Sequence, residues 1–340
     1  MTRSANSQIK PLNVVLRPGS PASRAYARRQ APAAVSAEAV TAEGFREIPK
    51  WDLKDHGGRK ITDLVFVNRY LGGAAAWDTG DMKNIDTALS GAMSDSRLES
   101  VIAQYYPGAI SSRMLPSDVV PGAVPARFFK DQAEELAARL FKEGVLGDSD
   151  PRESVINLLL PRGVVLVDGF SPGFQPPPGT EEEHGRRQEA LIKLDDDADS
   201  DSAHGLGGFH ESVHVKHNGQ DVTVYYAVGV FSEGDNGIVV FDGQNDAWAN
   251  VVATFYHELN EARTDPDVGD AIRLNDIRKL GWYSEAGQGE IGDLPVNEAE
   301  SGPHPDISRV FKVVPLANGT GKVPVQLMWS NAAHAPAESL

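Results

Sequence analysis

The run from Trp248 to Ala262 constrains the fold of this chain more than any other segment, because its apolar residues follow a helical repeat. The apolar positions are Trp248, Val251, Val252, Phe255, Leu259 and Ala262. This spacing forms one continuous stripe along a helix. Pro266 follows shortly afterwards, and the residue before a proline is pushed out of helical geometry. The sequence therefore predicts an amphipathic helix at about 245–263.

The face opposite the stripe carries His257 and Glu261, which lie one above the other because they are four residues apart. An imidazole and a carboxylate so placed can bind one divalent cation, and Glu258 between them could act as a general base. This is the His-Glu-x-x-His layout of zinc hydrolases with Glu in place of the second His. The alternative is a solvated polar face with an incidental His-Glu pair.

Composition narrows the classes of function. The net charge of -16 argues against nucleic acid or an anionic membrane as a partner. No apolar run is long enough for a membrane span or for a signal peptide, so cytoplasmic residence is the default, with non-classical export left open. Without cysteines, a metal would have to be held by His, Asp and Glu.

The pattern along the chain predicts an α/β (α+β) fold, with a mixed β-sheet, flanking helices and a zincin-like active-site helix. Residues 1–50 are expected to form a flexible N-terminal arm, and 51–340 a single domain with an irregular acidic insertion at 170–205. In that insertion a solvated loop is favoured over a calcium site, because the loop glycine is missing. Expected strands lie at 63–71, 155–160, 164–167, 213–215, 222–231, 311–314 and 323–329, and expected helices at 81–106 and 129–143. Asn218-Gly219 predicts a type I′ hairpin turn.

A second motif, His210-Glu211-Ser212-Val213-His214, matches His-Glu-x-x-His literally. Alternation of apolar and polar residues predicts a strand here, where residues four apart are separated by about 13 Å. The two histidines therefore cannot bind the same ion. His210 alone remains a candidate ligand for a metal held by the predicted helix, and a solvent-facing histidine is the alternative.

Downstream of the helix, Glu290 and Asp293 could each supply a carboxylate to complete a metal site. The alternative for Asp293 is that it only braces a turn. Tyr283 could donate a hydrogen bond to an oxyanion. Residues 238–241 are apolar and form a candidate edge strand for binding a peptide by strand addition.

Several segments together resemble the phosphate-induced protein 1 / EXORDIUM-like family of plants and its bacterial relatives. They are Gly207-Gly208-Phe209-His210, His257 to Glu261 with Thr264-Asp265-Pro266, Gly281-Trp282-Tyr283, Glu290 to Leu294, and Gln326 to Asn331. The plant members are growth-associated extracellular proteins with no firmly established reaction. Gly207 and Pro295 stand where the relatives carry cysteines, which a reducing compartment would explain. The resemblance implies that His210, His257 and Glu261 converge at one site.

Three functions follow from these patterns. The first is a metal-dependent hydrolase, a zincin-like metallopeptidase that acts on a peptide or protein with a metal-activated water. Its cofactor would be Zn²⁺ or another divalent metal held by His257 and Glu261 with His210, Glu290 or Asp293. Glu258 would take the proton of the metal-bound water, and Tyr283 would donate a hydrogen bond to the oxyanion. The second is a non-catalytic EXORDIUM-like binding protein with a structural metal site. The third is an α/β protein without metal, in which His257 pairs with Glu261 or Asp293.

Overall fold

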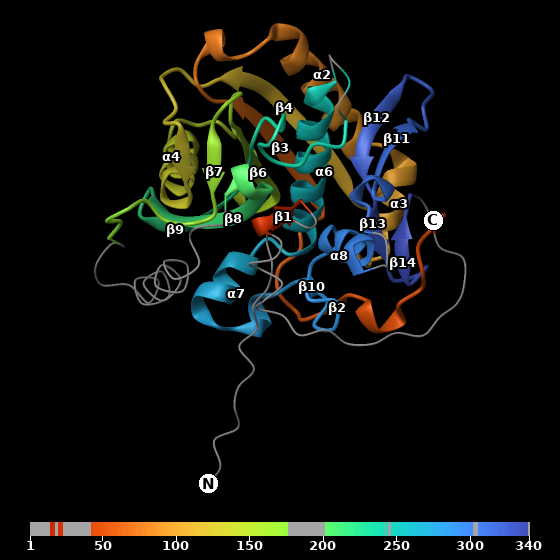
Figure 1. Ribbon diagram of the computed structural model, residues 1–340. Coiled ribbons are helices and arrows are strands. Elements are labelled where there is room, and N and C mark those ends of the chain that lie inside the picture. Colours follow the sequence, from red (N-terminus) through yellow and green to blue (C-terminus); the bar gives the residue numbers. More distant parts are fainter. Residues whose placement is uncertain are drawn as a thin grey trace.

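The structure, a computed structural model, has a mixed main sheet, several two-stranded sheets and flanking helices (Figure 1). It describes residues 14–17, 20–22, 42–175, 201–241, 243, 246–301 and 305–338. The helices are α2 (Thr79–Met93), α3 (Ser96–Ala103), α4 (Lys130–Lys142), α6 (Ala247–Thr264), α7 (Val268–Leu274) and α8 (Asp293–Ser301). None of these helices within the described ranges is long and apolar enough to cross a membrane.

The main sheet has the strand order β1-β8-β9-β6-β3-β4. Its strands are β1 (Val14–Leu16), β3 (Asp63–Tyr70), β4 (Ser111–Val119), β6 (Ser154–Leu159), β8 (Leu206–His217) and β9 (Gln220–Gly229). The run β9-β6-β3-β4 is parallel, whereas β8 and β1 are added antiparallel at one side. The two-stranded sheets pair β2 (Lys54–Asp55) with β10 (Trp282–Tyr283), β5 (Arg127–Phe129) with β7 (Val165–Val167), β11 (Phe311–Pro315) with β12 (Lys322–Gln326), and β13 (Met328–Ser330) with β14 (Ala335–Ala337). The predicted α/β class with a mixed sheet and flanking helices is confirmed.

The two faces of the sheet carry separate cores, because successive side chains of a strand point to opposite faces. In β9, Tyr225 and Ala227 join the core formed with α2, α3 and α6. Tyr226 and Val228 join the other core, formed with α4. In β8, Phe209 likewise belongs to the α4 core, so His210 next to it faces α6.

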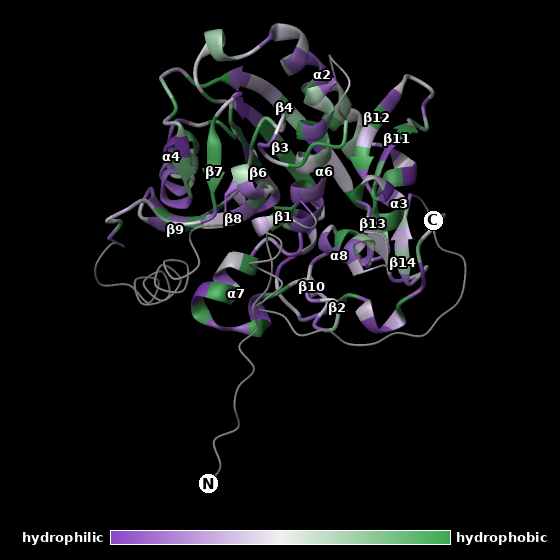
Figure 2. Cartoon of the chain, in the orientation of Figure 1, coloured by the Kyte–Doolittle hydropathy of each residue, from purple (hydrophilic) through white to green (hydrophobic). Residues whose placement is uncertain are grey.

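The predicted helix at 245–263 is α6, which lies at the centre of the molecule (Figure 1). Every residue from Ala249 to Thr264 is buried, on the polar face as well as on the apolar stripe. Figure 2 shows hydrophilic segments on this central helix although it lies within the fold. The alternative of a solvated polar face is therefore wrong, because β8, β12 and the turn before α8 lie against this face.

The predicted hairpin is confirmed, since Asn218 and Gly219 both have positive φ between β8 and β9. The predicted helical region at 81–106 is instead two helices. Ser94 ends α2, and the Asp95 carboxylate accepts from the backbone N–H groups of Arg97 and Leu98 to begin α3. Local capping chemistry therefore divides an apolar pattern that looked continuous.

Two other segments differ from the structure predicted from the sequence, and a third lies mostly outside the described residues. Within the expected N-terminal arm, β1 joins the sheet, and Phe45 and Ile48 are buried in the core. Residues 238–241 do not form a strand; the Asn250 side chain accepts from the backbone N–H groups of Val240 and Phe241. Most of the expected acidic insertion, residues 176–200, lies outside the described residues.

Candidate metal centre

Side chains from three separate parts of the chain meet beside α6. His257, Glu258 and Glu261 come from α6 itself, and His210 comes from the adjacent strand β8. Glu290 and Asp293 come from the start of α8 and the turn before it. All six are buried, with Glu258 and Glu261 fully inaccessible. The convergence of His210, His257 and Glu261 predicted from the sequence is therefore present in the structure.

A first ligand group consists of His257, Glu261 and Asp293. His257 Nε2 lies 3.0 Å from Glu261 Oε2 and 3.9 Å from Asp293 Oδ1. Neither His257 Nε2 nor Glu261 Oε2 makes a hydrogen bond within the described residues. Two ligands bound at about 2.1 Å to one tetrahedral ion lie roughly 3.4 Å apart, so these separations suit a shared ion.

Gln326 of β12 fixes the orientation of His257. The Gln326 amide donates to the Gly292 carbonyl at 2.6 Å, so its oxygen faces His257 Nδ1 at 3.0 Å and accepts the proton there. This tautomer leaves the Nε2 lone pair directed at Glu261 and Asp293, as a metal ligand requires. A Cβ atom on Gly292 would lie 2.5 Å from His257 Nδ1, so only glycine allows this approach.

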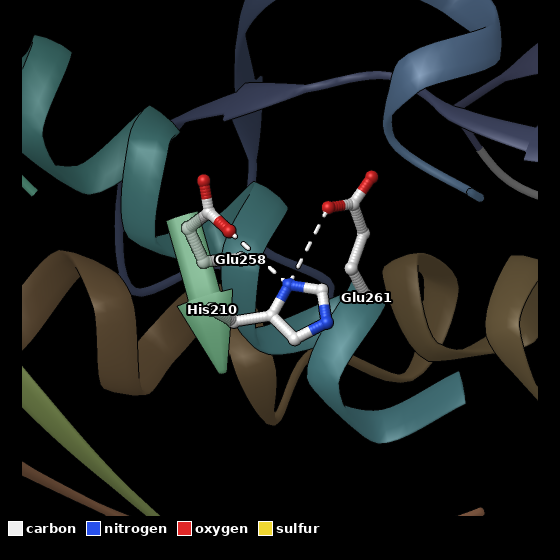
Figure 3. A group of neighbouring side chains, drawn as sticks. All are labelled: His210, Glu258 and Glu261. Atoms are coloured by element: carbon white, nitrogen blue, oxygen red, sulfur yellow. Dashed lines mark hydrogen bonds and ion pairs between the residues drawn. The ribbon is translucent and has the colours of Figure 1, made fainter. Parts of the chain in front are cut away.

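A second ligand group consists of His210, Glu258 and Glu261, and it shares Glu261 with the first (Figure 3). His210 Nδ1 lies 3.3 Å from Glu258 Oε2 and 3.7 Å from Glu261 Oε2. The other ring nitrogen, Nε2, faces the Asp265 carbonyl at 3.4 Å and Glu290 Oε1 at 3.7 Å. Glu261 therefore lies between the two histidines and is the residue common to both groups.

The centre has a large excess of acidic groups. The group comprises five carboxyls and two imidazoles: Glu258, Glu261, Asp265, Glu290, Asp293, His210 and His257. None of these carboxyls forms an ion pair with Lys or Arg within the described residues. Both Glu290 carboxylate oxygens lack a hydrogen-bond partner there. A buried carboxylate without a partner is costly, so this volume requires protons or a bound cation.

The pKa values of these groups are shifted by the excess of buried carboxyls. Burial raises the pKa of Glu258 to about 8, although the hydrogen bond from His210 opposes the shift. Burial and the neighbouring carboxylates raise the pKa of Glu290 and Asp293 well above the ordinary range. Burial alone would lower the pKa of His257, but Glu261 and Asp293 outweigh it and raise the value. Each effect would be relieved by a positive ion among the carboxylates.

The donor set fits a divalent metal. Imidazole nitrogens combined with carboxylate oxygens suit zinc and also other first-row divalent ions. In the first group, Asp293 Oδ2 accepts from the Glu290 backbone N–H at 3.1 Å, while Oδ1 faces His257. Asp293 thus braces its turn and also presents an oxygen to the centre, which combines the two roles considered from the sequence.

Tyr283 of β10 is buried, and the carboxyls of Asp293, Glu290 and Asp265 act on it electrostatically. Burial and these charges raise the pKa of Tyr283 well above its ordinary value, so its hydroxyl stays protonated and can donate.

Gln326 and Asp265 were not identified from the sequence as members of the site. The sequence pattern placed Gln326 in a closing strand and Asp265 at a helix end, and neither position carries a local signal for a buried polar centre.

The chain was compared with protein-family models, curated proteins and solved structures, and nothing matches. The resemblance to the EXORDIUM-like family accordingly stays a prediction based on its motifs. The function has to be argued from the centre itself.

Proposed function

We propose that this chain is a metal-dependent hydrolase, a zincin-like peptidase whose metal is bound by His257 and Glu261. The observation that carries the proposal is the shared position of Glu261 between the two histidines, next to Glu258. Asp293 completes the ligand set in preference to Glu290, because it faces His257 and belongs to the same ligand group. A bound divalent cation would polarise a substrate carbonyl and lower the pKa of water.

The other residues have separate roles in this proposal. Glu258 would accept the proton of the attacking water, because a cation bound next to it would oppose the rise in its pKa that burial causes and would favour the carboxylate form. His210, whose Nδ1 lies 3.3 Å from Glu258 Oε2, would orient that carboxylate. Tyr283 would donate a hydrogen bond to the oxygen that gains charge. Gln326 keeps the lone pair of His257 directed at the metal.

A structural metal site is the second candidate, and complete burial of the centre favours it. His257 and Glu261 are 0% exposed, and enough carboxylates surround them to close the coordination without a water position. An arrangement without any metal is disfavoured, because it would leave both Glu290 carboxylate oxygens buried without a hydrogen-bond partner among the described residues.

The test is elemental analysis of protein purified without a metal-affinity tag, together with a peptidase assay. We expect about one equivalent of zinc per chain, which His257→Ala loses. Glu258→Gln should keep the metal and lower turnover by about 10²–10⁴-fold, because only the proton acceptor is removed. Zinc without any turnover would support the structural site. A metal-free protein with unchanged stability in chelator would refute both candidates.

A further inference from the structure

The outer edge of β8, next to the metal centre, is occupied by a segment from near the start of the chain. β1 runs antiparallel to β8, with Val14 opposite Phe209 and Val15 opposite Gly208. His210, two residues further along β8, belongs to the centre. Apart from β1, β8 pairs only with β9 among the described strands. β1 thus occupies the one side of β8 on which an added strand could pair.

β1 also reaches the candidate general base. The Val15 backbone N–H faces the Glu258 carboxylate and acts to lower its pKa. A Cβ atom on Gly208, the residue opposite Val15, would lie 3.3 Å from Glu258 Oε1 and 2.7 Å from the Val228 carbonyl, so glycine leaves room for the carboxylate here. A backbone N–H of the segment therefore lies beside the proposed general base.

The side chains of the segment pack into apolar cores on both faces of the sheet. Val14 and Leu16 join the α4 core, and Val15 packs with Ile238 and Ala253. All three residues of β1 are buried. An external ligand in this position would need the same features, which are an extended backbone and apolar side chains at three successive positions.

β1 is joined to the sheet by few backbone pairs. It is three residues long and pairs with one neighbour, and its register shifts between Val15 and Leu16. β8 and β9, in contrast, pair over ten positions without such a shift. A short strand bound at one edge opens at lower free energy than the strands inside a sheet.

We propose that β1 is a built-in occupant of a peptide-binding edge: β8 takes an extended apolar peptide by strand addition, and the chain's own segment fills this position until it is displaced or cut. The catalytic consequence rests on the proposed hydrolase function, whereas the binding does not. Displacement would remove the Val15 N–H from beside Glu258 and let a substrate backbone lie beside the centre. The burial that favours a structural metal site would then be a property of the occupied form.

The first experiment measures peptide exchange on the full chain. A recognition sequence for a site-specific protease is inserted between Ala22 and Ala42, and the cut protein is kept folded under native conditions. A fluorescent peptide with the sequence of residues 9–22 is then titrated by anisotropy. We expect saturable binding to the cut protein and none to the intact chain, because the covalent segment outcompetes the peptide at its high effective concentration.

The matched control is the same peptide N-methylated at Val15, which replaces the N–H that faces Glu258 with a methyl group. Its affinity should be lower by roughly tenfold or more, because the buried strand loses a donor and gains bulk at this position. Equal binding of both peptides would refute the contact with Glu258. Failure of the native peptide to exchange into folded, cut protein would refute the proposal.

Hydrogen exchange on the unmodified chain gives a test that needs no variant. We expect the β1 amides to exchange by local opening, at least about 100-fold faster than the amides of β6. Equal protection of β1 and β6 would make β1 a permanent strand and overturn the proposal.

The outcomes separate this proposal from the proposed function. Peptide exchange without turnover of any substrate, before or after cutting, would support the occupant and refute the hydrolase. Equal turnover by intact and cut protein, with no peptide exchange, would support the hydrolase and refute the occupant. Exchange together with a rise in turnover after cutting supports both.

Discussion

One strand supplies two charged clusters that are balanced in different ways. From β8, His210 points to the metal centre, whereas Glu211 and His214 join a second group, here called the ion-pair cluster. Its members are Lys130, Glu211, His214, Asp270, Arg273 and Lys279. Glu211 receives Lys130 Nζ at 2.5 Å and Arg273 Nη1 at 3.0 Å. Asp270 lies 3.0 Å from both His214 Nε2 and Lys279 Nζ, and it also pairs with Arg273.

The difference lies in what compensates the carboxylates. In the ion-pair cluster, Lys, Arg and His side chains surround two carboxylates, so the protein itself supplies the opposite charge. In the metal centre, five carboxyls meet two imidazoles and no Lys or Arg forms an ion pair with them within the described residues. The two clusters should therefore respond in opposite directions when a charge is removed, which provides a direct way to test the assignment.

The largest effect is expected for Lys130→Met in the ion-pair cluster. Lys130 is 1% exposed, and its loss would leave Glu211 with a buried, undercompensated charge. The free energy of unfolding should fall by about 3–5 kcal/mol, measured by urea denaturation. Lys142→Met at the exposed end of α4 is the matched control and should change it by less than about 0.5 kcal/mol. A loss as small as that of the control would show that the cluster is not the balanced unit described above.

Asp293→Asn should have the opposite sign in metal-free protein. Removing one of five crowded carboxyls relieves repulsion, and the amide oxygen can still accept from the Glu290 backbone N–H. Stability in chelator should therefore stay equal or rise. Zinc affinity should fall by about 100-fold or more, because the loss of a ligand exceeds the 10–100-fold cost of losing an outer partner. A destabilised metal-free protein with unchanged zinc affinity would remove Asp293 from the ligand set.

The sequence could predict the elements that carry the centre, because their signals are local. The apolar stripe of α6 and the alternation in β8 depend on residues within one turn or one strand. The same periods placed His257, Glu258 and Glu261 on one helix and separated His210 from His214. The hairpin turn at Asn218-Gly219 was likewise a local signal.

The rest depends on contacts between distant segments, which local patterns do not contain. A polar helix face predicts solvent, but β12 and the turn before α8 cover this face of α6. Gln326 acquires its role only when β12 packs against His257. β1 is three apolar residues in a segment rich in Ala, Pro and Arg, and its strand character comes from pairing with β8. The predicted edge strand at 238–241 was wrong for the same reason. The Asn250 side chain binds the backbone of that segment, which pairs with no described strand.

Gln326→Leu tests the metal centre without changing its charge, because it removes only the group that orients the His257 ring. Leucine has a similar volume but cannot accept the proton of His257 Nδ1, so the ring loses the restraint that directs Nε2 at Glu261. Zinc affinity, measured by competition with a chelating dye, should fall by about 10–100-fold. The NMR signal of the hydrogen-bonded His257 Nδ1 proton should disappear as well. Unchanged affinity together with an unchanged signal would show that Gln326 does not orient this ligand.

The smallest effect is expected from acid titration of the ion-pair cluster. Burial would raise the pKa of Asp270, but His214, Arg273 and Lys279 outweigh it and hold the pKa well below the ordinary range. A carboxyl with a lowered folded-state pKa stabilises the protein above its unfolded-state pKa of about 4, and this contribution is lost as the pH falls further. Because His214 contacts Asp270 and an ordinary imidazole titrates near pH 6.5, the comparison is made below about pH 5. There, the stability difference between the unmodified chain and Asp270→Asn should shrink as the pH falls through about 4 and below. Taking the difference cancels the titration of the metal centre, which is common to both proteins. A difference that did not shrink between about pH 5 and pH 2 would mean that the folded protein does not hold the pKa of Asp270 below its ordinary value, and the contrast with the metal centre would fail.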